Sequence, residues 1–272
     1  MTPEYWSGTR QGMIDKCGEQ YRRRYGLGEK LPPAIVMVRG SAVHVANEAN
    51  MLAKMDGGGI SVEEARDIAA SSFDERVSAG YVIDGTYAKE KWEPKAAVGH
   101  CRDDAVHLAA LHVEEVAPTI EPTATEVRIE VQPSDAIPVP FVSILDVIDR
   151  GKRPVDTKTK SKAPAERDAD VSQQLSGQAL AFRAYYGEAE EWLRLDVLVR
   201  TPKTRKAKNY PLKTTRTADD LAVFVRRVRT AISSVEAEIF LPAPADHWVC
   251  NPLWCGYYET CPYARGRSRP SS

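Results

Sequence analysis

The sequence predicts an α/β protein with a mixed central sheet flanked by helices. Apolar residues recur at helical spacing through most of the first hundred residues, whereas alternating and β-branched runs follow Pro118. Further helical runs and one more strand-like run share the remainder of the chain. Because 272 residues with 43% hydrophobic content can bury a large core, we expect one folded unit with about four or five strands.

The helical part comes first. Spaced apolar residues among charges, or alanine-rich runs, predict helices over residues 7–25, 38–54, 61–79 and 98–116. The first of these should close near Gly26, and the second places His44 and Glu48 on one face.

The strands follow. Residues 125–132 alternate apolar and polar side chains, and residues 138–149 are rich in β-branched and apolar residues. The turn-forming run RGKR then separates two extended segments, so residues 141–158 should form a β-hairpin. Beyond it we expect a helix over 169–186, a strand over 192–200 and a helix over 218–237.

The two ends of the chain differ in character. The N-terminus contains acidic residues and no continuous apolar stretch, and the chain has no run of about 18 apolar residues. We therefore expect a cytoplasmic protein that does not enter a membrane. The last part, from His247 onward, is cysteine-rich and irregular, and residues 265–272 have the composition of a disordered tail. The expected folded unit is 1–264.

Basic residues are concentrated in one segment. The formal net charge is −1, yet residues 200–216 contain seven Lys or Arg and no Asp or Glu. Such a cluster can contact the phosphates of a nucleic acid, and the alternative is a solvated basic loop without a ligand. The candidate DNA-binding residues are Lys203, Arg205, Lys206, Lys208, Lys213 and Arg216.

The hairpin carries the residues with the clearest chemical potential. Asp146 and Asp156 lie on its two strands and can stand side by side, and Lys158 points to the same face as Asp156 because side chains alternate along a strand. Two converging carboxylates are a minimal site for Mg²⁺, and a neighbouring ammonium can polarise water and offset charge on a phosphate. An Asp-x-Lys tripeptide is also common on exposed strand faces, so the context decides.

That context resembles the PD-(D/E)XK nuclease superfamily, in particular RecB-like exonucleases that include phage and CRISPR-associated members. The resemblance rests on SILDVID, VDTKTK, QQLSGQALAF and GSAVHVANE. It implies a restriction-endonuclease-like fold and hydrolysis of DNA with Mg²⁺ or Mn²⁺. It further implies metal ligation by His44, Asp146, Asp156 and the Thr157 carbonyl, catalysis by Lys158, and a supporting role for Gln174. Two positions depart from the pattern: Ser143 replaces a glycine, and Gln178 replaces a tyrosine.

Each of these residues also has an ordinary structural explanation. His44 could be a core or surface histidine, Asp146 a strand-end acid, and Gln174 a helix-surface amide. The order His, Asp, Asp-x-Lys, Gln across suitable elements favours the nuclease interpretation. The alternatives are a nucleic-acid-binding module that has lost cleavage, and a zinc-stapled scaffold within a recombination or CRISPR complex.

Three of the five cysteines, Cys250, Cys255 and Cys261, lie within twelve residues. The resemblance implies that they hold a 4Fe-4S cluster together with Cys17, so that Cys17 and residues 247–263 form a cap and Cys101 is a bystander. Four thiolates suit a cluster or structural Zn²⁺. One isolated cysteine plus a triplet differs from the two close pairs usual for zinc, which favours the cluster. The resemblance also implies that single-stranded DNA ends are the substrate.

Overall fold

The computed structural model describes residues 2–200, 206–244 and 246–264. The chain divides into two compact units, each assembled from separate stretches of sequence. Unit 1 comprises residues 1–31, 130–142 and 222–272, and unit 2 comprises residues 32–129 and 143–221. None of the described helices combines the length and apolarity needed to cross a bilayer.

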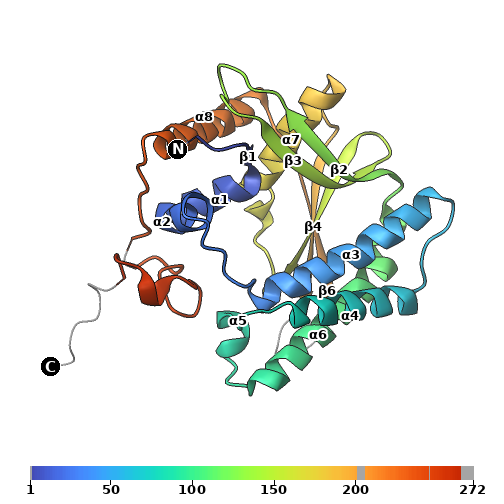
Figure 1. The fold of residues 1–272 in the computed structure, drawn as a ribbon. Coiled ribbons are helices and arrows are strands. Elements are labelled where there is room, and N and C mark those ends of the chain that lie inside the picture. The colour runs from blue at the N-terminus through green and yellow to red at the C-terminus, as the bar shows by residue number, and fades with distance from the viewer. Residues whose placement is uncertain (1, 201–205, 245, 265–272) are drawn as a thin grey trace. The chain divides into compact units, whose positions relative to one another are not determined.

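Unit 2 contains a mixed sheet with helices on both faces, which confirms the predicted fold class (Figure 1). Its strands follow the order β3-β4-β5-β6, and β2 also pairs with β3. The pairings β3–β4 and β5–β6 are antiparallel, whereas β4–β5 is parallel. The strands are β2 (Pro122–Val131), β3 (Phe141–Asp149), β4 (Arg153–Lys160), β5 (Leu193–Arg200) and β6 (Ala207–Thr214).

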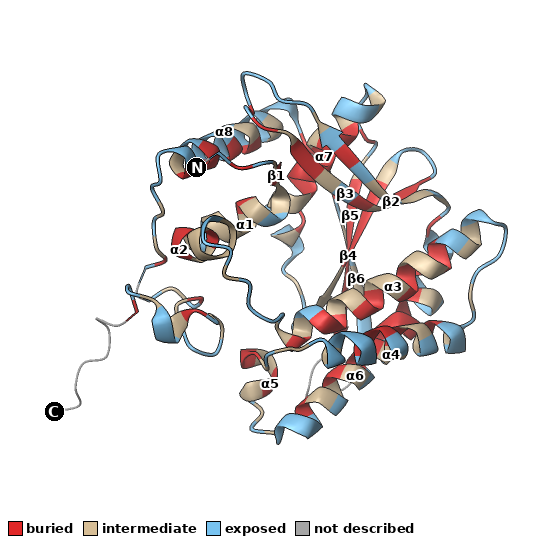
Figure 2. Cartoon of the chain, in the orientation of Figure 1, coloured by how far each residue is buried: buried red, intermediate tan, exposed pale blue. Residues whose placement is uncertain are grey.

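The two faces of β5 show how the sheet is covered. Every residue of β5 is buried (Figure 2). Leu198 packs in a core formed with helices α3 (Ile35–Met55), α4 (Val62–Ser78) and α6 (Pro94–Leu111), whereas Leu195 and Val197 pack against α7 (Gln173–Tyr186). Because side chains alternate along a strand, these two helical layers lie on opposite faces of the sheet.

Short elements complete unit 2. Helix α5 (Gly85–Ala88) precedes α6, and π-helical and 3₁₀ turns over His112–Val116 and Ala117–Thr119 lead from α6 to β2. A further 3₁₀ turn, Glu166–Asp168, lies between β4 and α7, which accordingly begins later than residue 169. Helix α4 begins with a complete capping box between Ser61 and Glu64.

Unit 1 is built around aromatic side chains. Strand β1 (Trp6–Ser7) pairs in parallel with Phe141 and Val142 at the start of β3. The Trp6 ring lies 5.6 Å from that of Tyr21, and Phe141 contacts Phe224 edge-on at 5.8 Å. The other elements are α1 (Gly8–Lys16), α2 (Gly18–Tyr21), a π-helical turn (Arg22–Gly26), most of α8 (Ala218–Glu236) and a 3₁₀ turn (Tyr258–Thr260).

The first helix differs from the expected continuous run over 7–25. It breaks at Cys17, whose backbone is extended with φ −165° and ψ 110°. A Cβ placed on Gly18 would lie 2.7 Å from backbone atoms of Leu241, and the Gly18 N–H donates to the Leu241 carbonyl at 2.7 Å. The close approach of the C-terminal segment therefore interrupts the helix, which the local sequence does not reveal.

A buried imidazole in unit 2 makes stability sensitive to acid. His112 is 1% exposed, and burial, followed by the charges of His44, Arg194 and Lys54, lowers its pKa from 6.5 to about 3. A depressed folded-state pKa contributes stability above about pH 6.5 that is lost as pH falls toward 3. We expect His112→Leu to flatten the loss of unfolding free energy between pH 6.5 and 4, measured by urea titration. An equal flattening by His107→Leu, an exposed change on the preceding helix α6, would contradict this assignment.

Candidate functional site

The candidate site lies in unit 2, where β3 and β4 separate. Their antiparallel pairing runs from Asp149 and Arg153 to Val147 and Val155. One position further, the Thr157 N–H donates to Oδ2 of Asp146 at 3.1 Å. The Asp146 carboxylate therefore takes a backbone donor of β4, and it lies beside the Asp156-Thr157-Lys158 segment as the hairpin prediction requires.

Asp156 is the buried centre of this site. It is 1% exposed, and three side chains donate to its Oδ1. Lys158 Nζ lies 3.2 Å away, Gln174 Nε2 2.6 Å and Gln178 Nε2 2.9 Å. The two glutamines stand one turn apart on α7, so that helix fixes the orientation of the carboxylate.

Helix α3 brings His44 to the same place. Its Nδ1 lies 3.4 Å from Oδ2 of Asp146, and its side chain is 29% exposed. One turn earlier, a Cβ on Gly40 would lie 3.4 Å from the Thr159 hydroxyl, so this glycine allows α3 to pass close to β4. His44, Asp146, Asp156, Lys158 and Gln174 are thus brought together.

The site carries an excess of carboxylates. Glu126 of β2 joins it, because ligand atoms of His44, Glu126 and Asp146 all lie within 4.8 Å of one another. Burial, then the charge of Asp156, raises the pKa of Asp146 to about 6. Glu126 is exposed, yet desolvation by its surroundings, then the charges of Asp146, Glu48 and Asp156, raises its pKa to about 7. Clustered acids with raised pKa values indicate a place where a cation would be stabilised.

Lys158 supplies a positive charge that partly compensates these carboxylates. Burial lowers its pKa, but the carboxylates of Asp156 and Asp146 outweigh that effect, so the pKa lies above its ordinary value. The side chain is nevertheless 36% exposed. The ammonium is therefore charged at neutral pH and can still reach a bound ligand.

Sequence reasoning missed two of these residues. Gln178 occupies the position at which the family resemblance implied a tyrosine, yet it donates to Asp156 and also to the Ile144 carbonyl at 3.3 Å. Glu126 lies in an alternating strand beside Arg128 and Glu130, where acids are usually solvent-facing. No sequence motif and no spacing relative to the hairpin residues marks Glu126 as a site residue.

The cysteines form a second candidate site, in unit 1. Cys17, Cys250, Cys255 and Cys261 line one pocket, together with Gln20 and tail residues. The Gln20 amide donates to Cys255 Sγ at 3.2 Å, and the Ala243 N–H donates to Cys17 Sγ at 3.3 Å. None of the five cysteines, which all lie in the described part of the chain, forms a disulfide, and Cys101 is buried elsewhere in the α3/α6 core. We call the site lined by Cys17, Cys250, Cys255 and Cys261 the cysteine pocket.

The fold is similar to that of a solved structure. A crystal structure from Eubacterium rectale, named "Putative exonuclease", aligns over 99% of this chain and 90% of its own with a TM-score of 0.54 at 12% identity. A second structure, SSO0001, aligns over 97% of this chain and 88% of its own at 13% identity, with a TM-score of 0.45. That TM-score is too low to establish a shared fold. At 12% identity the first likeness shows the fold alone. No family model and no curated protein matches the chain.

Part of the basic segment forms a strand that the sequence did not predict. From Ala207 to Thr214 it forms β6, an outer strand of the sheet that pairs with β5 along its whole length. Lys206, Lys208 and Lys213 are exposed, as phosphate contacts require, although lysines on an edge strand also discourage pairing with another sheet. Lys203 and Arg205 lie outside the described residues.

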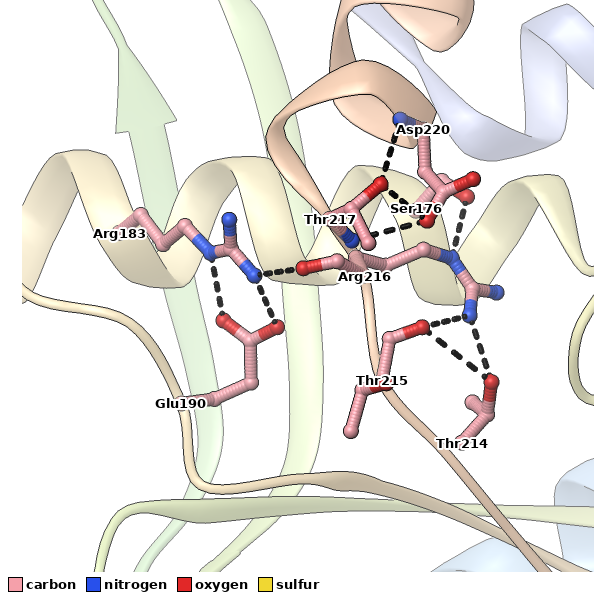
Figure 3. Close-up of polar contacts among 8 residues, drawn as sticks. All are labelled: Ser176, Arg183, Glu190, Thr214, Thr215, Arg216, Thr217 and Asp220. Atoms are coloured by element: carbon pink, nitrogen blue, oxygen red, sulfur yellow. Dashed lines mark hydrogen bonds and ion pairs between the residues drawn. The ribbon is translucent and has the colours of Figure 1, made fainter.

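Arg216 is a correction to the predicted DNA-binding set. It is 6% exposed, and its guanidinium is occupied inside unit 2 (Figure 3). Nε donates to the Ser176 hydroxyl at 2.9 Å, Nη1 to the Thr214 hydroxyl at 2.8 Å, and Nη2 to the Ala169 carbonyl at 2.7 Å. A guanidinium whose donors are all engaged by the protein stabilises the junction of β6 and α7 and is not free to bind phosphate.

Removing Arg216 should therefore affect stability. We expect Arg216→Met to lower the free energy of unfolding by on the order of 2–4 kcal/mol, because several buried acceptors lose their donor. Urea unfolding followed by circular dichroism measures the change. Lys208→Ala, at an exposed position on the adjoining strand, is the control and should shift the midpoint little. Equal effects of the two substitutions would contradict the structural role.

Proposed function

We propose that this chain is a metal-dependent DNA exonuclease of the RecB-like PD-(D/E)XK type, which hydrolyses phosphodiester bonds at single-stranded ends. The observation that supports it best is the convergence of His44, Asp146, Asp156 and Lys158 where β3 and β4 separate. The resemblance alone suggests the biological setting, which is recombination, repair, or phage or CRISPR DNA processing. It also suggests a cytoplasmic location and a partner protein.

The residues present fit a divalent ion such as Mg²⁺ or Mn²⁺. Oδ2 of Asp156 accepts no hydrogen bond within the described residues, although Lys158 Nζ lies 3.0 Å from it, and the residue is buried. Asp156 is close enough to Asp146 for its charge to raise the pKa of that carboxyl beyond the effect of burial, and a buried oxygen in this position suits an ion that prefers oxygen and imidazole ligands. His44, Asp146, Asp156 and the Thr157 carbonyl would hold it, and such an ion lowers the pKa of bound water and neutralises phosphate charge.

The protein groups around that ion have separate tasks. Lys158, kept charged by its neighbouring acids, would stabilise negative charge that develops on the phosphate oxygens. Gln174 and Gln178 hold the Asp156 carboxylate in one orientation, so that little rearrangement is needed when substrate binds. Lys206, Lys208 and Lys213 supply phosphate contacts along the edge strand.

We further propose that the cysteine pocket holds a 4Fe-4S cluster with a structural role. Its support is the gathering of the four thiols from both ends of the chain in one pocket, with N–H donors to two sulfurs. One isolated cysteine plus a triplet also differs from the two close pairs usual for structural zinc, which favours the cluster.

Cleavage of end-labelled DNA tests the proposed activity. With Mg²⁺ or Mn²⁺, the wild-type chain should shorten single-stranded DNA from an end, and Asp146→Asn should abolish shortening because the metal loses a carboxylate. Asp67→Asn, an exposed change on α4, is the control and should cleave normally. If the wild-type chain binds DNA but leaves it intact under all metal conditions, the inactive binding module is the better description.

A further inference from the structure

A carboxylate that no sequence motif identifies lies at the proposed metal site. Glu126 is on β2, outside the hairpin, and it shares with His44 and Asp146 the tightest cluster of ligand atoms in the described residues, all within 4.8 Å of one another. The three side chains come from α3, β2 and β3. The cluster therefore combines one imidazole with two carboxylates from separate elements.

The backbone of β2 presents this carboxylate to the site. Next to it, the Thr125 hydroxyl donates to the backbone carbonyl of Asp146 at 2.9 Å, which ties β2 to β3 at the level of the proposed ligand. Glu126 itself has a φ of +49°, in the left-handed region that non-glycine residues seldom adopt within a strand. Regular strand geometry is therefore interrupted at Glu126, where the carboxylate lies within 4.8 Å of the ligand atoms of His44 and Asp146.

The charge on Glu126 has no cationic partner of its own. Within the described chain, its carboxylate forms no ion pair with Lys or Arg, whereas Asp156 has Lys158 and both glutamines. Besides desolvation, the charges of Asp146, Glu48 and Asp156 raise the pKa of Glu126, and the charge of Lys158 lowers it by less. Unpaired carboxylates at short range repel one another unless a cation lies between them.

The spacing suits direct ligation of one ion. At metal–ligand distances near 2.1 Å, two ligands of an octahedral ion stand about 3.0 Å apart when adjacent and about 4.2 Å apart when opposite. Separations of up to 4.8 Å among His44, Glu126 and Asp146 need small movements to reach those values. The buried Oδ2 of Asp156, without a hydrogen-bond donor in the described residues, offers a further ligand from the adjoining strand.

We propose that Glu126 is a direct ligand of the catalytic divalent ion, bound together with His44 and Asp146. The inference rests on the proposed function, since it assumes that an ion binds at this site. It adds a carboxylate from β2 to the ligand set carried by α3 and the hairpin. The added negative charge would hold the ion more tightly and leave fewer positions for water or substrate oxygens.

Mn²⁺ binding, measured by electron paramagnetic resonance on the full chain at pH 8, tests the proposal apart from activity. Glu126→Gln keeps the size of the side chain but weakens its ligand, and we expect its Mn²⁺ affinity to fall at least tenfold. Glu48→Gln is the matched control, because it removes a neighbouring negative charge that lies outside the cluster of ligand atoms. We expect that substitution to weaken binding less than threefold. Melting temperatures of the metal-free proteins establish that each variant is folded.

The outcomes separate this inference from the proposed function. If Asp146→Asn loses Mn²⁺ binding while Glu126→Gln binds as the wild type does, Glu126 is not a ligand and the nuclease proposal stands. If Glu126→Gln and Glu48→Gln weaken binding equally, Glu126 acts through its charge alone and direct ligation is overturned. If the wild-type chain binds no Mn²⁺ at all, the proposed function fails and this inference fails with it.

Discussion

Lys158→Ala is expected to lower the rate of DNA cleavage by about 10²–10³-fold or more, since removing one preorganised group that stabilises developing charge has effects of this size. The ammonium lies 3.0 Å from Oδ2 of Asp156 and is partly exposed. Its pKa is raised by the surrounding carboxylates, so we expect it to act as a fixed positive charge and not as a proton acceptor. Single-turnover cleavage of end-labelled DNA at saturating Mg²⁺ measures the effect.

Two further variants make this prediction specific. Lys162→Ala, at an exposed position four residues along the chain, should cleave at the wild-type rate. Lys158→Arg retains the charge, but its planar guanidinium cannot reproduce a compact ammonium, so we expect partial activity. Wild-type cleavage by Lys158→Ala, in a protein that still loses activity with Asp146→Asn, would show that this lysine has no catalytic role.

The hairpin and its acids were predictable because local pattern and local structure agree there. Alternation through β3 and β4 places Asp146 and Asp156 on adjoining strands, and the RGKR turn sets where they meet. Contacts with Gln174 and His44 come from distant segments. Those were predictable through family resemblance and not through periodicity, because no local pattern relates a helix residue to a strand residue far along the chain.

The sequence predictions failed in the basic segment, where tertiary contacts and not local composition decide the structure. No strand was predicted over residues 207–214, yet they form β6, an outer strand on which most side chains are exposed or only partly buried. Arg216 ends the same basic run but is buried by Ser176 and Ala169, which belong to a different segment. Charge counts along a sequence cannot distinguish an arginine that binds phosphate from one that ties two elements together.

Glu126 shows the corresponding limit at the candidate site. In the sequence it alternates with Val127 and Ile129 and resembles any solvent-facing acid of a strand. Its positive φ and its proximity to Asp146 depend on how β2 lies along β3. Neither property has a local sequence signature.

Cys255→Ser is expected to remove the proposed 4Fe-4S cluster, and with it much of the stability of unit 1. The pocket joins segments near the two ends of the chain, as the Gln20–Cys255 contact across 235 positions illustrates, and closing so long a loop restricts the unfolded chain strongly. If the loss is about 3–5 kcal/mol, comparable to that of a long-range cross-link, the melting temperature should fall by on the order of 10 °C. Thermal unfolding, iron analysis and visible absorption measure the three consequences.

Cys101→Ala provides the matched comparison, since it removes a thiol that lies outside the pocket. Cys101 is buried in the α3/α6 core, where burial raises its pKa to about 12 and its S–H donates to the Ile35 carbonyl at 3.4 Å. This variant should keep its iron and its brown colour, and lose only the stability that its packing and this hydrogen bond provide. A colourless wild-type protein containing one zinc would identify the pocket as a zinc site. If Cys255→Ser retained full iron content, Cys255 would not be a ligand. The proposed cluster that links the N-terminal and C-terminal segments would then need another set of ligands.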